Sequence, residues 1–132
     1  MVTLFEECIH ALGENCKVLS KEETNRLFSK LGEKFPFTSW GRIDWEKVDN
    51  RLYLASSDEI IRYFKRETNP FNGIVYIIWD EAALPAVKSD LQTILQVIDD
   101  VTAVSFDTWL YCPSDEYVIE FYHEGEIVLG MR

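Results

Sequence analysis

The residues best suited to acid–base or metal chemistry lie in the second half of the chain. His123 stands between acidic residues, beside Glu124 and three positions after Glu120, a grouping that could transfer a proton. A histidine at the rim of a hairpin is, however, more often a polar surface residue. Clustered carboxylates on or beside expected strands could also hold Mg²⁺. They are Asp80, Glu81, Asp107, Glu120 and Glu126.

The rest of the sequence favours a protein without catalytic activity. It has no nucleophile elbow and no H-E-x-x-H, C-x-x-C, P-loop or G-x-G-x-x-G motif. A metal-dependent nuclease needs cations to hold phosphate, yet after residue 66 the only basic residues are Lys88 and Arg132. Glycoside hydrolysis needs only two carboxylates, but a chain of 132 residues offers little room for a cleft. We therefore expect no catalytic residue, no metal and no cofactor.

Charge is divided very unevenly along the chain. Residues 1–66 carry 11 Lys and Arg against 11 Asp and Glu, whereas residues 67–132 carry 2 against 12, which accounts for the whole net charge of −10. An acidic surface repels phosphate, so we expect no direct contact with nucleic acid and none with a membrane. The same surface would attract a basic protein, and electrostatic attraction would speed that encounter.

The acidic half is also rich in Trp and Tyr, which often anchor protein interfaces. Because side chains alternate between the two faces of a strand, Asp107, Trp109 and Tyr111 share one face, as do Glu120 and Tyr122. We interpret these as the solvent faces, with His123 and Glu124 at the rim and Asp80 and Glu81 extending the acidic patch. The alternative is that the rings are half buried under a loop. The predicted partner-binding residues are Asp80, Glu81, Asp107, Trp109, Tyr111, Glu120, Tyr122 and Glu124.

Composition sets the general class of the protein. With 47% hydrophobic and 14% aromatic residues, the chain can build a real core. Its three cysteines are odd in number and widely spaced, and the first residues do not resemble a secretory signal, so we expect a reducing, cytoplasmic location. No stretch approaches the roughly 18 apolar residues of a membrane span.

The pattern of apolar residues predicts an α+β fold. Helices are expected over residues 3–12, 20–35, 57–65 and 84–98, the second opened by a capping box of Ser20 and Glu23. Strands are expected over 52–54, 74–79, 103–111, 117–122 and 126–131, with a short extended piece at 16–19 and a turn at 69–73. We predict a single domain over residues 1–132. It would have a mixed or antiparallel sheet of about four to five strands, with three to four helices packed on one face.

Three stretches also resemble a known class of proteins. Residues 76–85 read YIIWDEAALP, residues 100–109 read DVTAVSFDTW, and residues 117–126 read YVIEFYHEGE. Together with FTSWG at residues 37–41, they resemble immunity proteins of bacterial contact-dependent growth inhibition and related polymorphic toxin systems. None of these stretches is a catalytic motif, and such proteins differ widely in fold. The resemblance implies a small cytoplasmic protein that neutralises the C-terminal domain of a toxin.

Three hypotheses remain open at this point. The first is an inhibitor of a basic toxin domain, which the resemblance suggests is a nuclease. The second is a non-enzymatic adaptor or regulatory domain that binds another basic protein, and the third is a small carboxylate enzyme. The sequence does not indicate the oligomeric state, the toxin's activity or where on the toxin the protein binds.

Overall fold

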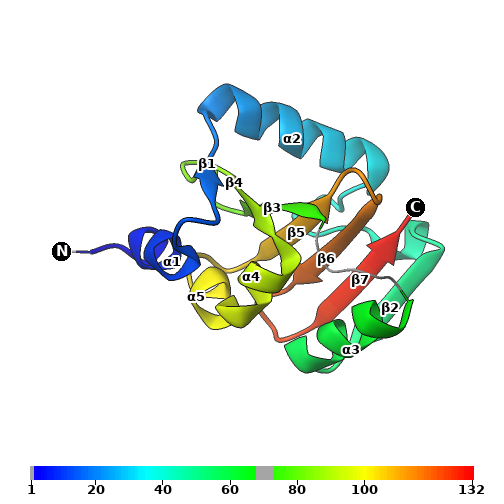
Figure 1. Ribbon diagram of the computed structural model, residues 1–132. Coiled ribbons are helices and arrows are strands. Elements are labelled where there is room, and N and C mark those ends of the chain that lie inside the picture. The colour runs from blue at the N-terminus through cyan, green and yellow to red at the C-terminus, as the bar shows by residue number, and fades with distance from the viewer. Residues whose placement is uncertain (1, 68–72) are drawn as a thin grey trace.

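A computed structural model describes residues 2–67 and 73–132 and shows one antiparallel sheet with helices on both faces (Figure 1). In this described part the helices are α1 (Leu4–Leu12), α2 (Lys21–Lys34), α3 (Ser57–Glu67), α4 (Leu91–Gln96) and α5 (Ile98–Thr102), with a 3₁₀ turn, η1, at Trp45–Lys47. The strands are β1 (Lys17–Val18), β2 (Asn50–Leu54), β3 (Ile74–Trp79), β4 (Val87–Asp90), β5 (Thr108–Cys112), β6 (Tyr117–Phe121) and β7 (Ile127–Met131). The α+β class is therefore confirmed.

The sheet has more strands than the sequence predicted. The described strands follow the order β1-β4-β3-β5-β6-β7-β2, which makes seven where four to five were expected. β5, β6 and β7 form a meander at its centre, and β2, early in the chain, pairs with β7 from Asn50↔Met131 to Leu54↔Ile127. The two additional strands are β1 and β4, which are only 2 and 4 residues long.

The helix predicted over residues 84–98 is wrong in its first half. Residues 87–90 instead form β4, which pairs with β3, so Val87 and Ser89 point into the protein as alternate residues of a strand. Asp90 then caps α4, because its carboxylate accepts a hydrogen bond from the backbone N–H of Thr93 at 2.8 Å. The helical spacing of the apolar residues spans two elements and is coincidental.

Other local predictions agree with the structure. β3 has the predicted bounds, and α2 begins at the predicted capping box, in which Glu23 N donates to Ser20 Oγ at 3.1 Å. The predicted strand over 103–111 begins later, at Thr108, because residues before it form the connection from α5. Residues 69–72 of the predicted turn lie outside the described part of the chain.

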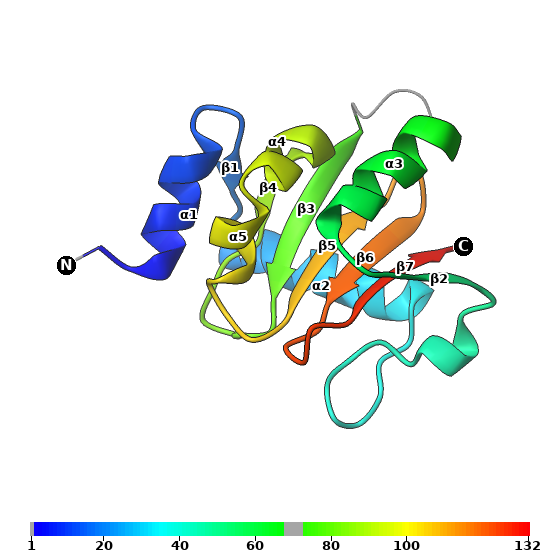
Figure 2. The same cartoon turned by 90° about the horizontal axis from the view of Figure 1, so that it is seen from below.

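The helices do not all pack on one face, as had been predicted. Helices α1, α3, α4 and α5 cover one face, where Cys8, Ile60, Leu91 and Val101 join a core with Leu110 and other sheet residues. Helix α2 and the segment of residues 35–48 cover the opposite face (Figures 1 and 2). Strand β5 carries apolar side chains on both faces of the sheet, Leu110 on one and Trp109 and Tyr111 on the other, so both faces need a covering layer. Helix α2 and residues 35–48 provide that layer for the face of Trp109 and Tyr111.

Gly130 on β7 lies directly beneath the ring of Trp45, in the second core, which is the core between the sheet and the layer of α2 and residues 35–48. A Cβ atom at this position would collide with the indole ring of Trp45. The absence of a side chain lets the ring of Trp45, only 5% exposed, pack directly against the strand. The segment after α2 is thus held tightly over β6 and β7.

Candidate partner-binding surface

The face of β5 and β6 that was predicted to be exposed is buried. Trp109 and Tyr111 are each 1% exposed and Glu120 is 0% exposed, so the prediction that they form a solvent face is wrong. Phe28 of α2 and Phe37 contact the ring of Trp109, and Phe35 contacts Tyr111, all in aromatic pairs with centroids 5.3–6.5 Å apart. Trp109, Tyr111 and Phe35 belong to the second core, and Phe37 packs against it.

Glu120 is a buried carboxylate that fastens the covering segment to the sheet. It accepts hydrogen bonds from the indole N–H groups of Trp45 at 2.9 Å and Trp109 at 3.0 Å. The backbone N–H of Ile43 donates at 2.9 Å, and the guanidinium of Arg42 donates at 2.6 Å. A buried charge is tolerated when it is paired and fully hydrogen-bonded, as it is here. The role of Glu120 is therefore to position residues 42–45.

Arg42 carries this network outward to the protein surface. Its guanidinium bridges Glu120 and Glu126, each at 2.6 Å, and lies 4.0 Å from the centroid of the Tyr122 ring. Burial alone would lower the pKa of Arg42, but the hydrogen bonds and charges of Glu126 and Glu120 raise it overall. Arg42 thus stays charged and holds the ring of Tyr122 in place.

A second network joins the loops at the same end of the sheet. Asp107 Oδ1 lies 2.8 Å from the backbone N of His123 and 2.9 Å from its Nδ1. Asp80 Oδ1 accepts from Asp107 N at 3.1 Å and from Ser105 Oγ at 2.6 Å. Asp107 is only 8% exposed, so it positions its neighbours more than it offers a charge to a partner. The connections after β3, before β5 and after β6 are therefore rigidly linked.

Two aromatic side chains that the sequence analysis did not select are strongly exposed at this end. Phe106 is 78% exposed and Trp40 is 73% exposed. The Phe106 ring lies 6.0 Å from His123, whose ring lies 4.3 Å from Tyr122, next to Arg42. Trp40 is two residues before Arg42, at the turn closed by Gly41, which has a φ of 97°. Figure 2 shows the β6–β7 turn and the connection from α2 to β2 at one end of the molecule.

We call this region the sheet-end surface and define it by its accessible members. They are Trp40, Asp80, Glu81, Phe106, Tyr122, His123 and Glu124. Of the predicted binding residues, the structure brings Asp80, Glu81, Tyr122 and Glu124 together here, with Asp107 beneath them. In the described residues no ion pair involves Asp80, Glu81 or Glu124. The surface therefore presents uncompensated negative charge beside exposed rings.

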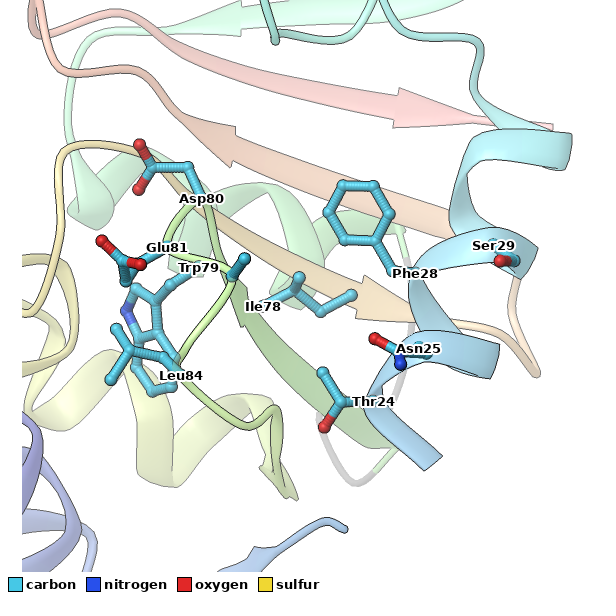
Figure 3. A pocket seen from close by; sticks show the side chains of 10 residues that line it. Thr24, Asn25, Phe28, Ser29, Ile78, Trp79, Asp80, Glu81 and Leu84 are labelled. Atoms are coloured by element: carbon cyan, nitrogen blue, oxygen red, sulfur yellow. The ribbon is translucent and has the colours of Figure 1, made fainter. Parts of the chain in front are cut away.

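A pocket adjoins the sheet-end surface between α2 and the end of β3 (Figure 3). It has a volume of about 400 Å³. Ile78 and Leu84 contribute apolar surface from the sheet side, and Phe28 and Asn25 contribute from α2. Asp80 and Glu81 lie across the pocket from α2, so the same carboxylates border both features.

Two other kinds of site bear on function. Across residues 2–67 and 73–132, no group of three or more His, Cys, Asp or Glu side chains is placed to hold a metal ion. Over the same residues, no helix has the length and apolar character needed to cross a membrane.

The chain matches a known family over nearly all of its length. A family model described as "CdiI immunity protein EcoliA0-like" matches residues 2–130. No curated protein matches the sequence.

Proposed function

The chain belongs to the CdiI immunity protein family and is a toxin-neutralising immunity protein, and on this premise we propose that it inhibits a basic nuclease domain by binding it through the sheet-end surface. The inhibition is stoichiometric and takes place in the cytoplasm, where a nuclease toxin would meet its substrate. The observation that carries the proposal is the pairing of unneutralised carboxylates with the exposed rings of Trp40 and Phe106 at one end of the sheet.

Charge supports a basic partner. The protein carries a net charge of −10, and Asp80, Glu81 and Glu124 add local negative charge without an ion-pair partner among the described residues. A nuclease binds phosphate through a cationic groove, which this surface complements. Complementary fields raise the association rate and reject acidic or neutral partners.

The aromatic residues supply the anchors that charge alone does not. Large rings that become buried in an interface commonly dominate the binding energy. Those of the sheet-end surface are presented on a rigid base, because Asp107 holds His123 and Arg42 holds Tyr122. A preorganised surface loses little conformational entropy on binding, which slows dissociation.

The test measures how surface variants bind the cognate toxin domain and protect cells against it. Trp40→Ala and Phe106→Ala should each raise the dissociation constant about 30-fold, a loss of about 2 kcal/mol of binding free energy. Ile74→Ala is the control, because Ile74 is another large apolar residue, 48% exposed, at the opposite end of β3 from Asp80. Unchanged affinity in the Trp40→Ala/Phe106→Ala double variant would assign binding to another surface.

The nuclease assignment needs its own measurement. The purified toxin domain should degrade RNA or DNA, and one equivalent of this protein should abolish that activity. A toxin domain that permeabilises vesicles and leaves nucleic acids intact would refute the nuclease assignment while preserving the role in immunity.

A further inference from the structure

We propose that the pocket between α2 and the end of β3 receives an arginine side chain of the bound toxin. This inference rests on the proposed function and specifies one contact within it. The pocket adjoins the sheet-end surface through Asp80, so a partner seated on that surface can reach it (Figure 3).

The pocket walls suit the flat, partly apolar side chain of arginine. Phe28 is 39% exposed, and its ring is held by contacts with Phe37 at 5.5 Å and Trp109 at 6.2 Å. Ile78, 2% exposed, lies on the sheet side. Guanidinium groups stack on aromatic faces, and their methylene stems pack on apolar surface. Figure 3 shows Phe28 and Asn25 projecting from α2 toward the strand.

The carboxylates of Asp80 and Glu81 supply the complementary charge at the rim of the pocket, on the side away from α2, and Figure 3 shows both pointing away from that helix. Asp80 uses Oδ1 for Ser105 and Asp107, and Glu81 uses Oε1 for the backbone N–H of Ala83 at 3.3 Å. No hydrogen bond in the described part of the chain reaches Asp80 Oδ2 or Glu81 Oε2. Each carboxylate is thus oriented by one oxygen while the other remains available. Two such acceptors match the forked donors of a guanidinium.

The pocket, at about 400 Å³, is large enough to admit a side chain, and it also lies within the roughly 300–1,000 Å³ of sites for small ligands and cofactors. Its location decides between the two. Its position beside the proposed interface favours a side chain of the partner over a free metabolite.

The first experiment tests the pocket without the toxin. N-acetyl-arginine methylamide is titrated to 100 mM into the ¹⁵N-labelled protein, with the uncharged citrulline analogue and the lysine analogue in parallel. The arginine compound should shift the amide signals of Asn25, Glu81 and Ala82, and the citrulline analogue should not. Equal shifts with the lysine analogue would show that the pocket accepts any long cationic side chain, and would refute its selectivity for arginine. The absence of shifts with either cation would overturn the proposal.

The second experiment uses variants with the toxin domain. Asn25→Arg should let the protein fill its own pocket, and Glu81→Gln should remove one charge, so each should weaken toxin binding at least tenfold. Glu46→Gln is the matched control, because Glu46 is exposed and does not line the pocket. Unchanged toxin affinity in both pocket variants would overturn the proposal.

The two proposals fail in different ways. If wild-type protein does not bind the toxin domain, the proposed function fails, whereas the arginine titration still decides the chemistry of the pocket. If the toxin binds and only the pocket variants are without effect, the proposed function stands and the pocket inference is wrong.

Discussion

Trp109 and Glu120 lie directly opposite each other on β5 and β6, and the indole N–H of Trp109 donates to the Glu120 carboxylate at 3.0 Å. Both side chains are buried beneath α2 and the segment of residues 35–48. The pair resembles the acidic and aromatic chemistry of an interface, but it binds the protein's own Trp45 and Arg42. An intramolecular partner therefore occupies the site that an external one would need.

Glu120→Gln should destabilise the protein strongly. A glutamine amide would point donor N–H groups at donors of Trp45, Trp109 or Ile43, and Arg42 would lose one of its two carboxylates. Removing one partner of a buried ion pair typically costs about 3–5 kcal/mol. Urea unfolding followed by tryptophan fluorescence measures the loss. Glu124→Gln makes the same chemical change at an exposed position. It should leave the free energy of unfolding within about 0.5 kcal/mol of wild type.

Gly130→Ala should also destabilise the protein, because the new methyl group would displace the Trp45 ring. Overpacking of this kind costs roughly 1–3 kcal/mol. Gly32→Ala is the control, since Gly32 lies within α2 and a Cβ there meets no atom within 4 Å. That substitution should raise stability by about 0.5–1 kcal/mol. Equal unfolding midpoints for the two variants would contradict the close contact between Gly130 and Trp45.

The free energy of unfolding should fall at alkaline pH, because the buried side chains of Cys8 and Tyr117 ionise less readily in the folded state than in the unfolded chain. Burial, followed by the charges of Asp100 and Cys16, raises the pKa of Cys8 from 9.0 to about 11, and burial raises the pKa of Tyr117 as well. The folded state therefore holds these protons more tightly than the unfolded state. The stabilisation from Cys8 is complete below pH 9 and declines as the pH rises toward 11.

Urea midpoints measured between pH 7.5 and 10.5 check this dependence. Cys8→Ala lacks the thiol and should show a shallower decline than wild type over the same range. Identical slopes for the two proteins would show that Cys8 ionises in the folded state as it does in the unfolded chain. All three cysteines are free thiols, so no disulfide interferes with the comparison.

Toxin association should depend strongly on salt. Because steering acts through exposed charges, raising NaCl from 0.05 to 0.5 M should slow association at least tenfold, while dissociation changes far less. Trp40→Ala should show the opposite pattern, with faster dissociation and little change in association. Stopped-flow fluorescence separates the two rates. An association rate that is insensitive to salt would refute charge steering.

Several features of the fold were predictable because they depend on neighbouring residues alone. The β-branched and aromatic run of β3 and the capping box of Ser20 and Glu23 are local patterns, and both were confirmed. The α+β class was also predictable. Strand β4 was not, because four residues within a helical spacing carry too little local information, and its identity depends on pairing with β3.

The predicted binding site likewise combines features set by local sequence with features set by tertiary packing. Alternation correctly placed Trp109 and Tyr111 on one face of β5, but it does not say what covers that face. The apolar residues Leu27 and Leu31 of α2, with Phe35 just after it, were the available signal, since they require a surface to pack against. Phe106 and Trp40 lie in irregular connections, where periodicity has no meaning, so their exposure was not predictable.

The sequence by itself determined the charge asymmetry, the free thiols' wide spacing, the main helices and strands, and the likeness to immunity proteins, because all of these reside in residue identity and short-range order. Only the tertiary structure decided which acids and rings reach a partner. Burial depends on which elements pack together over long sequence separations, as when Arg42 and Trp45 enclose Glu120, more than 70 residues away.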